Sequence, residues 1–332
     1  MPRQLITLKS VGRINRRNLV TQIDDEEVLI RENLMVIGTK NKFLKKIPGS
    51  KRYNSTSVGS SPVVSMFRYY TKNNSRKDFF FSGGVLYRIT EAGVTTALIS
   101  TFSPIAYPTF AEMRVSSNDI VYFSEGVNTG MYSHDNNVAD TFTKETAVTQ
   151  NFVQILPFLD RLWGFEEDSE SLYFSANLAP TNFTSSTDAG TITIGPRRGS
   201  KIQAIGILAE TLFIFKTDSI WVIEGRTPNE FQVREVVPHI GLAARRSLQN
   251  VESAFMGLMS DYEVWEFGGT RDSMTPVSYN LALAGDLTKD LNPIINRDRM
   301  EQVNSTYHNN LYRMCFTENG QTQNNLEYCY NT

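Results

Sequence analysis

The feature that most constrains the fold is a short phrase that recurs six times along the 332-residue chain. Each copy has an apolar-aromatic run, a polar turn with Gly, Asp, Ser or Asn, and a second apolar run. That pattern is the signature of a β-hairpin. The clearest copy is ETLFIFKTDSIWVIEG, over residues 210–225, and the others begin at Lys77, Asn118, Asp160, Ser253 and Asn309.

The spacing of these hairpins predicts the architecture. Their starts are separated by 41, 42, 50, 43 and 56 residues. A period of about 40 to 50 residues with only short β elements is typical of propeller blades, each a four-stranded sheet. An isolated hairpin is marginally stable, whereas neighbouring blades cover each other's apolar faces. We therefore predict an all-β chain, a β-propeller of about six blades, in which the repeated phrase is the inner hairpin of a blade.

Some features depart from a regular propeller. The last hairpin ends at Asn331 without room for further strands, and residues 1–60 fall outside the repeat. Strands from the N-terminal region that close the last blade, or a longer natural chain, are two explanations that stay open. A pair of β-sandwiches, with strands every 8 to 12 residues or so, is the alternative fold.

Residues 270–305 also interrupt the rhythm. This stretch combines Asp and Asn residues at capping positions with spaced leucines and a proline, at Leu281, Leu283, Leu287, Leu291 and Pro293. The pattern predicts an irregular insertion, either a short helix or a loop. Because insertions between the strands of a rigid scaffold usually project from it, we expect a partner contact here.

Charge is distributed unevenly. The formal net charge is −2, but residues 1–60 hold twelve Lys or Arg and five Asp or Glu, a local +7, which leaves −9 for the rest. We predict a basic N-terminal arm over 1–60 and a propeller over 61–332. Clustered basic side chains attract phosphates without sequence specificity, although many are only solvated. The residues predicted to contact DNA or another subunit are Arg13, Arg16, Arg17, Lys45, Lys46, Arg197 and Arg198.

Neither a secretory h-region nor a run of about 18 apolar residues occurs in the sequence, so we expect synthesis in the cytoplasm and no membrane insertion. The two cysteines, Cys315 and Cys329, are too few for a disulfide framework. We expect them to be reduced, buried thiols.

The sequence predicts no catalytic residue, metal site or cofactor site. His134, His239 and His308 have no neighbour at metal-ligand spacing and are expected on the surface or in turns. The stretch GPRRGSK, at 195–201, has neither the glycine spacing nor the Lys-Ser order of a phosphate-binding loop. A basic turn between strands is the expectation there.

One short motif suggests an alternative function. Residues 186–193, STDAGTIT, match the Asp-box pattern of sialidase-type propellers. A sialidase would show several such boxes together with an Arg triad and a Tyr nucleophile. The single box is expected to be a tight turn at Asp188, with Gly190 at positive φ. A carbohydrate-active or carbohydrate-binding propeller stays the alternative reading.

Three further stretches carry a resemblance to a known family. They are a Leu-Tyr-Phe-Ser strand with a Pro-x-x-Phe turn (172–175 and 180–183), Phe-Lys-x-x-Ser-Ile-Trp (215–221) and Gly-x-x-Ala-x-Arg-Ser (241–247). In this order they resemble the β-propeller proteins of tailed-bacteriophage virions, especially tail hub or nozzle proteins. The N-terminal region is similar too, with an acidic stretch (24–27), a Glu-Asn-Leu strand (32–34) and a Lys-Ile-Pro-Gly turn (46–49).

The resemblance covers roughly residues 20–270 and implies a structural role without catalysis. Such proteins form a ring, about six or twelve copies, by a heterologous interface that closes on itself. The expected partners are further copies of the chain, the portal or adaptor, tail or fibre proteins, and passing double-stranded DNA. The expected location is the tail or neck of the virion, after synthesis in the host cytoplasm.

Overall fold

The computed structural model describes most of the chain after residue 60 and two short strands before it. The described residues are 34–37, 43–46, 58–59, 61–71, 75–104, 106–116, 118–127, 130–135, 141–185, 187–196, 199–278 and 291–332. The chain divides into two compact units, one of Arg52–Leu242 and one of Met1–Lys51 with Ala243–Thr332.

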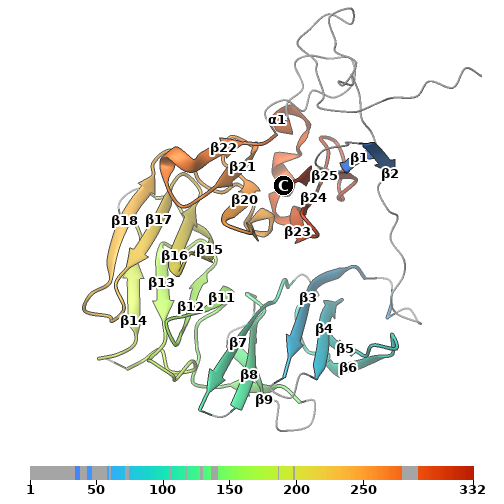
Figure 1. Ribbon diagram of the computed structural model, residues 1–332. Helices are drawn as coiled ribbons and strands as arrows, with labels where there is room; N and C mark the ends of the chain where they lie inside the picture. The colour runs from blue at the N-terminus through green and yellow to red at the C-terminus, as the bar shows by residue number, and fades with distance from the viewer. Residues whose placement is uncertain are drawn as a thin grey trace, which may run out of the picture. The chain divides into compact units, whose positions relative to one another are not determined.

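The unit of Arg52–Leu242 contains four antiparallel four-stranded sheets, each formed by four consecutive strands (Figure 1). The first two sheets contain β3 (Val63–Tyr70), β4 (Arg76–Ser82), β5 (Val85–Ile89), β6 (Thr95–Ile99), β7 (Thr109–Val115), β8 (Asn118–Ser124), β9 (Met131–Asp135) and β10 (Thr143–Glu145). The next two contain β11 (Phe152–Phe158), β12 (Arg161–Glu166), β13 (Ser171–Phe174), β14 (Gly190–Thr193), β15 (Ile202–Leu208), β16 (Thr211–Lys216), β17 (Ile220–Glu224) and β18 (Gln232–Val237).

The other unit contains the fifth and sixth sheets and a separate strand pair. The fifth sheet is β19 (Gln249–Val251), β20 (Ala254–Leu258), β21 (Val264–Phe267) and β22 (Met274–Pro276). The sixth has three strands among the described residues, β23 (Asn304–His308), β24 (Leu311–Phe316) and β25 (Leu326–Asn331). The separate pair is β1 (Leu34–Ile37) with β2 (Phe43–Lys46). Closure of the last blade by N-terminal strands stays a prediction, as does the boundary at residue 60.

The predicted fold class, an all-β propeller of six blades, is confirmed. Each of the six sequence phrases forms a pair of consecutive antiparallel strands, such as β16 and β17 around a turn at Lys216–Ser219. In the four-stranded sheets these hairpins supply the two central strands. In β16, residues 212–216 are all buried, as expected for a strand covered on both faces.

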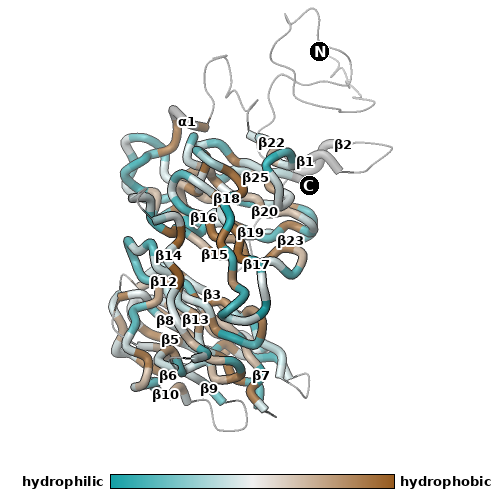
Figure 2. The backbone as a smooth tube through the Cα atoms, turned by 90° about the vertical axis from the view of Figure 1, so that its left-hand side faces the viewer, coloured by the Kyte–Doolittle hydropathy of each residue, from teal (hydrophilic) through white to brown (hydrophobic). Residues whose placement is uncertain are grey.

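The apolar core consists of separate clusters between consecutive sheets. One lies between the first and second sheets, one between the second and third, one between the third and fourth, and one between the fifth and sixth. Hydrophobic stretches accordingly lie within the sheets, and hydrophilic residues are frequent at the turns (Figure 2). The burial of apolar surface between sheets is therefore the main force that stabilises each unit.

Polar side chains also join the first strands of neighbouring sheets. The Gln154 amide on β11 bonds both backbone groups of Ile205 on β15, accepting from its N–H and donating to its carbonyl, each at 2.9 Å. Ser65 Oγ on β3 donates to the Pro108 carbonyl before β7, at 2.7 Å. In the other unit, Gln249 Nε2 on β19 donates to Ser305 O on β23, at 3.0 Å.

The irregular segment near 270–305 is confirmed, with one difference. It includes the short helices η3 (Arg271–Ser273), α1 (Leu291–Ile294) and η4 (Arg297–Gln302), but β22 lies within it as the outer strand of the fifth sheet. The expected leucines 281, 283 and 287 lie outside the described residues. Cys315 and Cys329 are free, as expected, but only half-buried, because they share one face of β24 and β25 with the partly exposed ion pair of Arg313 and Glu327.

Candidate binding cleft

A cleft lies at one end of the third and fourth sheets, within the unit of Arg52–Leu242. Its volume is about 770 Å³, which is within the usual range of ligand pockets, roughly 300 to 1,000 Å³. It is formed by the end of β11, the β15–β16 turn and the end of β17. The lining residues are Pro157, Phe158, Leu159, Ile207, Glu210, Thr211, Ile223, Glu224, Gly225 and Arg226.

Two tight turns contribute residues to the lining of the cleft. Phe158 pairs with Arg161 across the β11–β12 turn, and Leu208 pairs with Thr211 across the β15–β16 turn. The central residues of both turns have positive φ, at 50° and 56° in the first and 47° and 58° in the second. Positive φ at both positions is the two-residue hairpin geometry whose twist matches the flanking strands. Neither turn contains glycine or asparagine, so the usual sequence signal for this geometry is missing.

The apolar wall is held by contacts behind it. Phe158 is half-buried, and its carbonyl accepts a hydrogen bond from the indole of the fully buried Trp163, at 3.0 Å. Ile223 is buried in the apolar cluster between the third and fourth sheets. Because these neighbours are fixed, the wall is a preformed surface.

Charged groups surround the mouth of the cleft. Glu224 pairs with Arg234, with 2.6 Å between the carboxylate and Nη2, and both side chains are at least half exposed. The Arg226 N–H donates to the Glu230 carboxylate at 3.4 Å. Glu210 is exposed at the tip of the β15–β16 turn and forms no ion pair within the described part of the chain. The cleft thus combines an apolar wall with carboxylates at its rim.

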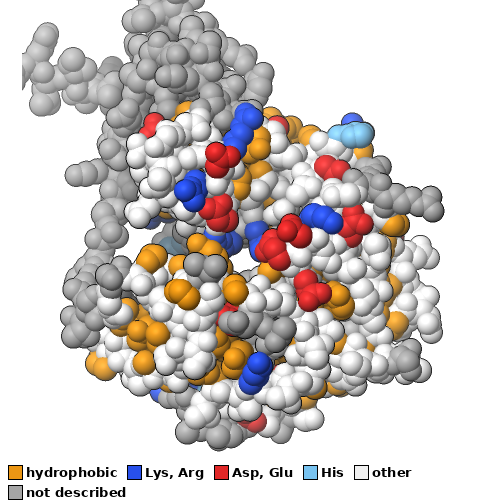
Figure 3. Space-filling view, turned by 180° about the vertical axis from the view of Figure 1, so that it is seen from behind, with side chains coloured by type: hydrophobic (Ala, Val, Ile, Leu, Met, Phe, Trp, Pro, Cys, Tyr) orange, Lys and Arg blue, Asp and Glu red, His pale blue; other side chains and the backbone are white. Residues whose placement is uncertain are grey.

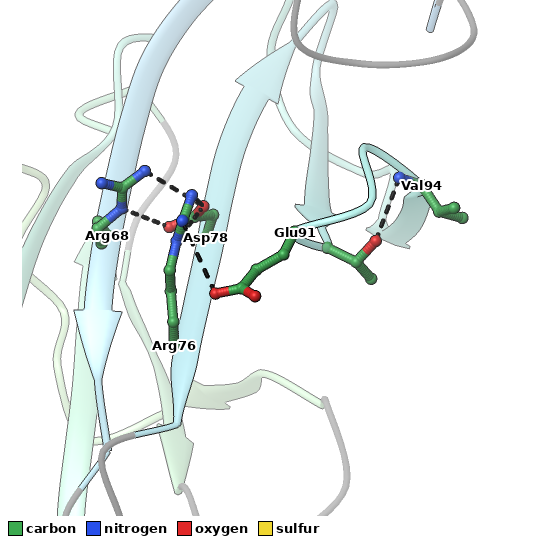
Figure 4. A network of polar contacts seen from close by, with 6 residues as sticks. Arg68, Arg76, Asp78, Glu91 and Val94 are labelled. Carbon is green, nitrogen blue, oxygen red and sulfur yellow. Dashed lines mark hydrogen bonds and ion pairs between the residues drawn. The ribbon is translucent and has the colours of Figure 1, made fainter.

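A second polar group lies on the first sheet (Figure 4). Asp78 on β4 is buried and accepts hydrogen bonds from Arg68 Nε on β3, at 2.9 Å, and from Arg76 Nε, at 2.8 Å. Arg76 also lies 3.8 Å from the exposed Glu91 carboxylate. Burial favours a higher pKa for Asp78, but the two guanidinium groups outweigh it and hold the pKa below its usual value. The Arg68–Asp78 contact therefore joins β3 to β4.

His134 contradicts the expectation of a surface histidine. It is fully buried on β9, against the rings of Phe79 and Phe142. Nδ1 lies 2.9 Å from the Thr141 carbonyl, which only accepts, so Nδ1 carries the proton and Nε2 accepts from Lys77 Nζ at 3.2 Å. Burial and the Lys77 charge lower the pKa of the imidazole. Neither His239 nor His308 departs from the expectation, since both are exposed at strand ends or turns.

Lys216 is a buried cation that sequence reasoning did not single out. It is fully buried at the end of β16, and Nζ donates to the Ile194 carbonyl at 2.7 Å and the Gly195 carbonyl at 3.4 Å. The Glu170 carboxylate lies 3.9 Å away. These partners belong to the third sheet and its end, so Lys216 joins the third and fourth sheets. The signal in the sequence was a lone lysine between Phe215 and a turn.

The Asp-box stretch has a structural role. Asp188 accepts from Arg161 Nη2 on β12 at 2.5 Å and from the Asn177 N–H at 2.8 Å, so it ties the long β13–β14 loop to β12. The Arg161 hydrogen bond is the main cause that lowers the pKa of Asp188. The expected positive φ at Gly190 is wrong, since Gly190 begins strand β14. Glycine is needed there because a Cβ would lie 2.9 Å from the Phe174 ring.

The predicted contact residues cannot be compared with this cleft. Arg13, Arg16, Arg17, Arg197 and Arg198 lie outside the described residues, and Lys45 and Lys46 belong to β2, whose backbone alone is described. Their roles stay predictions. Among the residues with described positions, no group of three or more His, Cys, Asp or Glu side chains could hold a metal ion. No helix within the same residues is long and apolar enough to cross a membrane.

No protein-family model and no curated protein matches this chain. Among solved structures, virginiamycin B lyase from Staphylococcus aureus shares 11% identity over 86% of this chain and 85% of its own, with a TM-score of 0.46. A streptogramin B lyase shares 11% over 71% and 76%, with a TM-score of 0.38. YCF48 from Cyanidioschyzon merolae shares 7% over 72% and 76%, with a TM-score of 0.44. Likeness at this level says nothing about what this chain binds or does.

Proposed function

We propose that this chain is a non-catalytic structural component of a tailed-bacteriophage virion, of the tail hub or nozzle type. In this proposal, about six or twelve copies form a ring around the DNA channel. The ring joins the portal or adaptor to tail parts or fibres, retains the packaged DNA and passes it at ejection. The protein is made in the host cytoplasm and assembled into the tail or neck.

The observation that carries the proposal is the position of the residues behind the family resemblance. In the first stretch, Phe183 packs on Phe152 with ring centroids 5.0 Å apart, in the cluster between the second and third sheets. In the second stretch, Lys216 bonds the end of the third sheet. Both stretches therefore contribute the junctions on which the rigidity of a propeller depends.

The third stretch, residues 241–247, also contributes close contacts between neighbouring segments, Gly241 in one unit and Ser247 in the other. Gly241 lies so close to the turn after β16 that a Cβ would come within 2.1 Å of the Lys216 carbonyl oxygen. In the other unit, the Ser247 carbonyl accepts hydrogen bonds from Tyr312 Oη at 2.7 Å and Ser305 Oγ at 2.9 Å, which joins the fifth and sixth sheets. A rigid subunit suits a ring that carries mechanical force better than a mobile subunit does.

The surface of the first sheet gives further support. Of the six large hydrophobic side chains that are exposed among the described residues, four come from this sheet or its turns: Val63, Met66, Tyr70 and Val94. Hydrophobic side chains gather over this sheet in the lower left of Figure 3. Exposed apolar groups on one sheet are typical of a surface that contacts another protein.

The test is the content of purified particles. We expect mass spectrometry of virions from the phage that carries this gene to detect the chain in several copies per particle. Tail-less particles from an assembly mutant should lose it. A chain that is absent from particles, or present only in infected-cell lysate, would overturn the proposal.

A carbohydrate-binding propeller is the second candidate, and the cleft is the observation that favours it. Phe158 offers an aromatic surface, and Glu210 and Glu224 offer carboxylates that can accept hydrogen bonds from sugar hydroxyls. Binding to a glycan array that is lost in Phe158→Ala, together with absence from the tail, would favour this alternative.

A further inference from the structure

The rim of the cleft is acidic. Two of its lining residues, Glu210 and Glu224, are exposed carboxylates. Asp160 follows the lining residue Leu159, and the backbone of Glu230 contacts Gly225, so two more exposed carboxylates adjoin the cleft. Against these four stand two arginines, Arg226 and Arg234, and Arg234 is already paired with Glu224. An occupant that combines apolar with basic side chains therefore suits this cleft.

The N-terminal sequence of the chain has this composition. Residues 1–23, MPRQLITLKSVGRINRRNLVTQI, contain five Arg or Lys and no Asp or Glu. Apolar side chains are interspersed among the basic ones, at Leu5, Ile6, Leu8, Val11, Ile14, Leu19, Val20 and Ile23. This segment lies outside the described residues. Fully extended, it spans at most about 75 to 80 Å.

We propose that the cleft formed by the β11–β12 turn, the β15–β16 turn and the end of β17 binds residues 1–23 of a second copy of this chain. The apolar side chains of the arm pack on the wall of Phe158, Ile207 and Ile223, and its arginines face the carboxylates of Glu210 and Glu230. Arm and cleft are different surfaces, so the contact is heterologous and joins copies head to tail. The inference rests on the ring of the proposed function and supplies the contact that forms it.

The physical consequences are specific. Because exposed charge pairs are screened by salt, the contact weakens as ionic strength rises. The apolar part of the contact persists and sets the residual affinity at high salt. A free peptide of residues 1–23 should compete with the arm of a neighbouring copy for the cleft.

The first experiment measures the arm and the cleft separately. The receptor is the full chain with Arg13→Glu, Arg16→Glu and Arg17→Glu, so that its own arm does not compete. We expect a fluorescein-labelled peptide of residues 1–23 to bind it, by anisotropy at 0.1 M NaCl. Adding Glu210→Lys and Glu230→Lys to the receptor should weaken the binding at least tenfold. Absent binding, or binding that these two changes leave unaltered, would overturn the inference.

A matched control keeps net charge from explaining the result. Glu91→Lys with Glu167→Lys reverses two exposed carboxylates on the β5–β6 and β12–β13 turns of the same unit, which do not line the cleft, and we expect less than a twofold change in peptide affinity. Tryptophan fluorescence checks that every variant is folded. Equal weakening by the control pair would show a nonspecific charge effect and refute the site.

A mixing experiment tests whether the arm comes from a second copy. The cleft-reversed chain keeps a basic arm, and the arm-reversed chain keeps an acidic cleft, so each supplies what the other lacks. We expect each variant alone to sediment as a monomer and a 1:1 mixture to form larger species that contain both. Binding of the free peptide without any mixed species would mean that the arm, while attached to its own chain, does not enter the cleft of a second copy. That outcome would refute the exchange between copies, whereas the location of the chain in virions tests the proposed function independently.

Discussion

The junction between the first and second sheets differs from the junction between the third and fourth. The first is aromatic: Phe123 contacts Phe102 and Phe142 edge to face, with ring centroids 5.4 Å and 5.2 Å apart. The second contains more aliphatic side chains, together with a few rings such as Trp163 against Phe231. It also contains polar links, in which the Gln154 amide and the Lys216 amine bond backbone groups of the neighbouring sheet. Both junctions join sheets of the same topology.

This difference teaches that a repeated topology fixes where sheets pack but not how. Aromatic packing is stabilised mainly in proportion to the buried area, with a modest added preference for edge-to-face or offset geometry. A buried amide or amine is directional, because each unsatisfied donor or acceptor costs free energy in the interior. Lys216, which lies in one of the stretches behind the proposed relationship, contributes one of the two polar links.

The largest expected effect is the loss of an aromatic ring from the first junction. Phe123 is fully buried in the cluster between the first two sheets. Phe123→Ala should lower the free energy of unfolding by about 3 to 5 kcal/mol, because it removes apolar contact and leaves a cavity. Urea unfolding followed by tryptophan fluorescence measures the loss. The control is Val94→Ala, at an exposed position; a similarly small effect at Phe123 would mean that this junction is not a packed core.

A smaller loss is expected at the buried amine of the second junction. Lys216→Met keeps the length of the side chain but leaves the Ile194 and Gly195 carbonyls without their donor. We expect a destabilisation of about 2 kcal/mol. Lys144→Met, at an exposed position on β10, is the control. If Lys216→Met raised the free energy of unfolding, the buried amine would destabilise the fold. The contrast between the two junctions would then fail.

The amide link should contribute less again. Gln154→Leu leaves the Ile205 N–H and carbonyl unpaired at the contact of β11 with β15. We expect a loss of about 1 to 2 kcal/mol in the same unfolding experiment. Gln232→Leu, on the outer strand β18, changes an exposed glutamine and should alter stability by less than about 0.5 kcal/mol. Equal effects at the two positions would contradict a role for Gln154 in joining the sheets.

The smallest expected effect is a pH dependence of stability that arises from His134 at the first junction. Burial lowers the pKa of His134 below its ordinary 6.5, so the folded protein keeps a neutral imidazole where the unfolded chain binds a proton. His134 therefore costs no stability above pH 6.5, and stability is lost as the pH falls from 6.5 toward the folded-state pKa. Each unit of pKa depression corresponds to about 1.4 kcal/mol. The stabilities of wild type and His134→Gln, compared at pH 7.5 and 5.5, measure this loss, and an unchanged pH slope in the variant would contradict it.

Much of the fold follows from the sequence because local chemistry sets it. Alternating turn residues and apolar runs define each hairpin, and runs such as residues 212–215 are apolar throughout because neighbouring sheets cover both faces. The cleft was not predictable in the same way. Its side chains come from three separate turns or strand ends, and the positive φ of Leu159, Asp160, Ala209 and Glu210 is held by tertiary context without glycine. Burial of His134 likewise depends on a neighbouring sheet, which no local pattern encodes.

The most direct test of the proposed structural role is a cryo-electron microscopy reconstruction of the intact virion. The account predicts six-bladed propellers, about six or twelve copies, in a ring around the DNA channel between portal and distal tail. Density for residues 1–23 of each copy should enter the neighbouring copy at the β11–β12 and β15–β16 turns. A tail whose axial ring contains no propeller of this sequence, or copies found only on peripheral spikes away from the channel, would contradict the account.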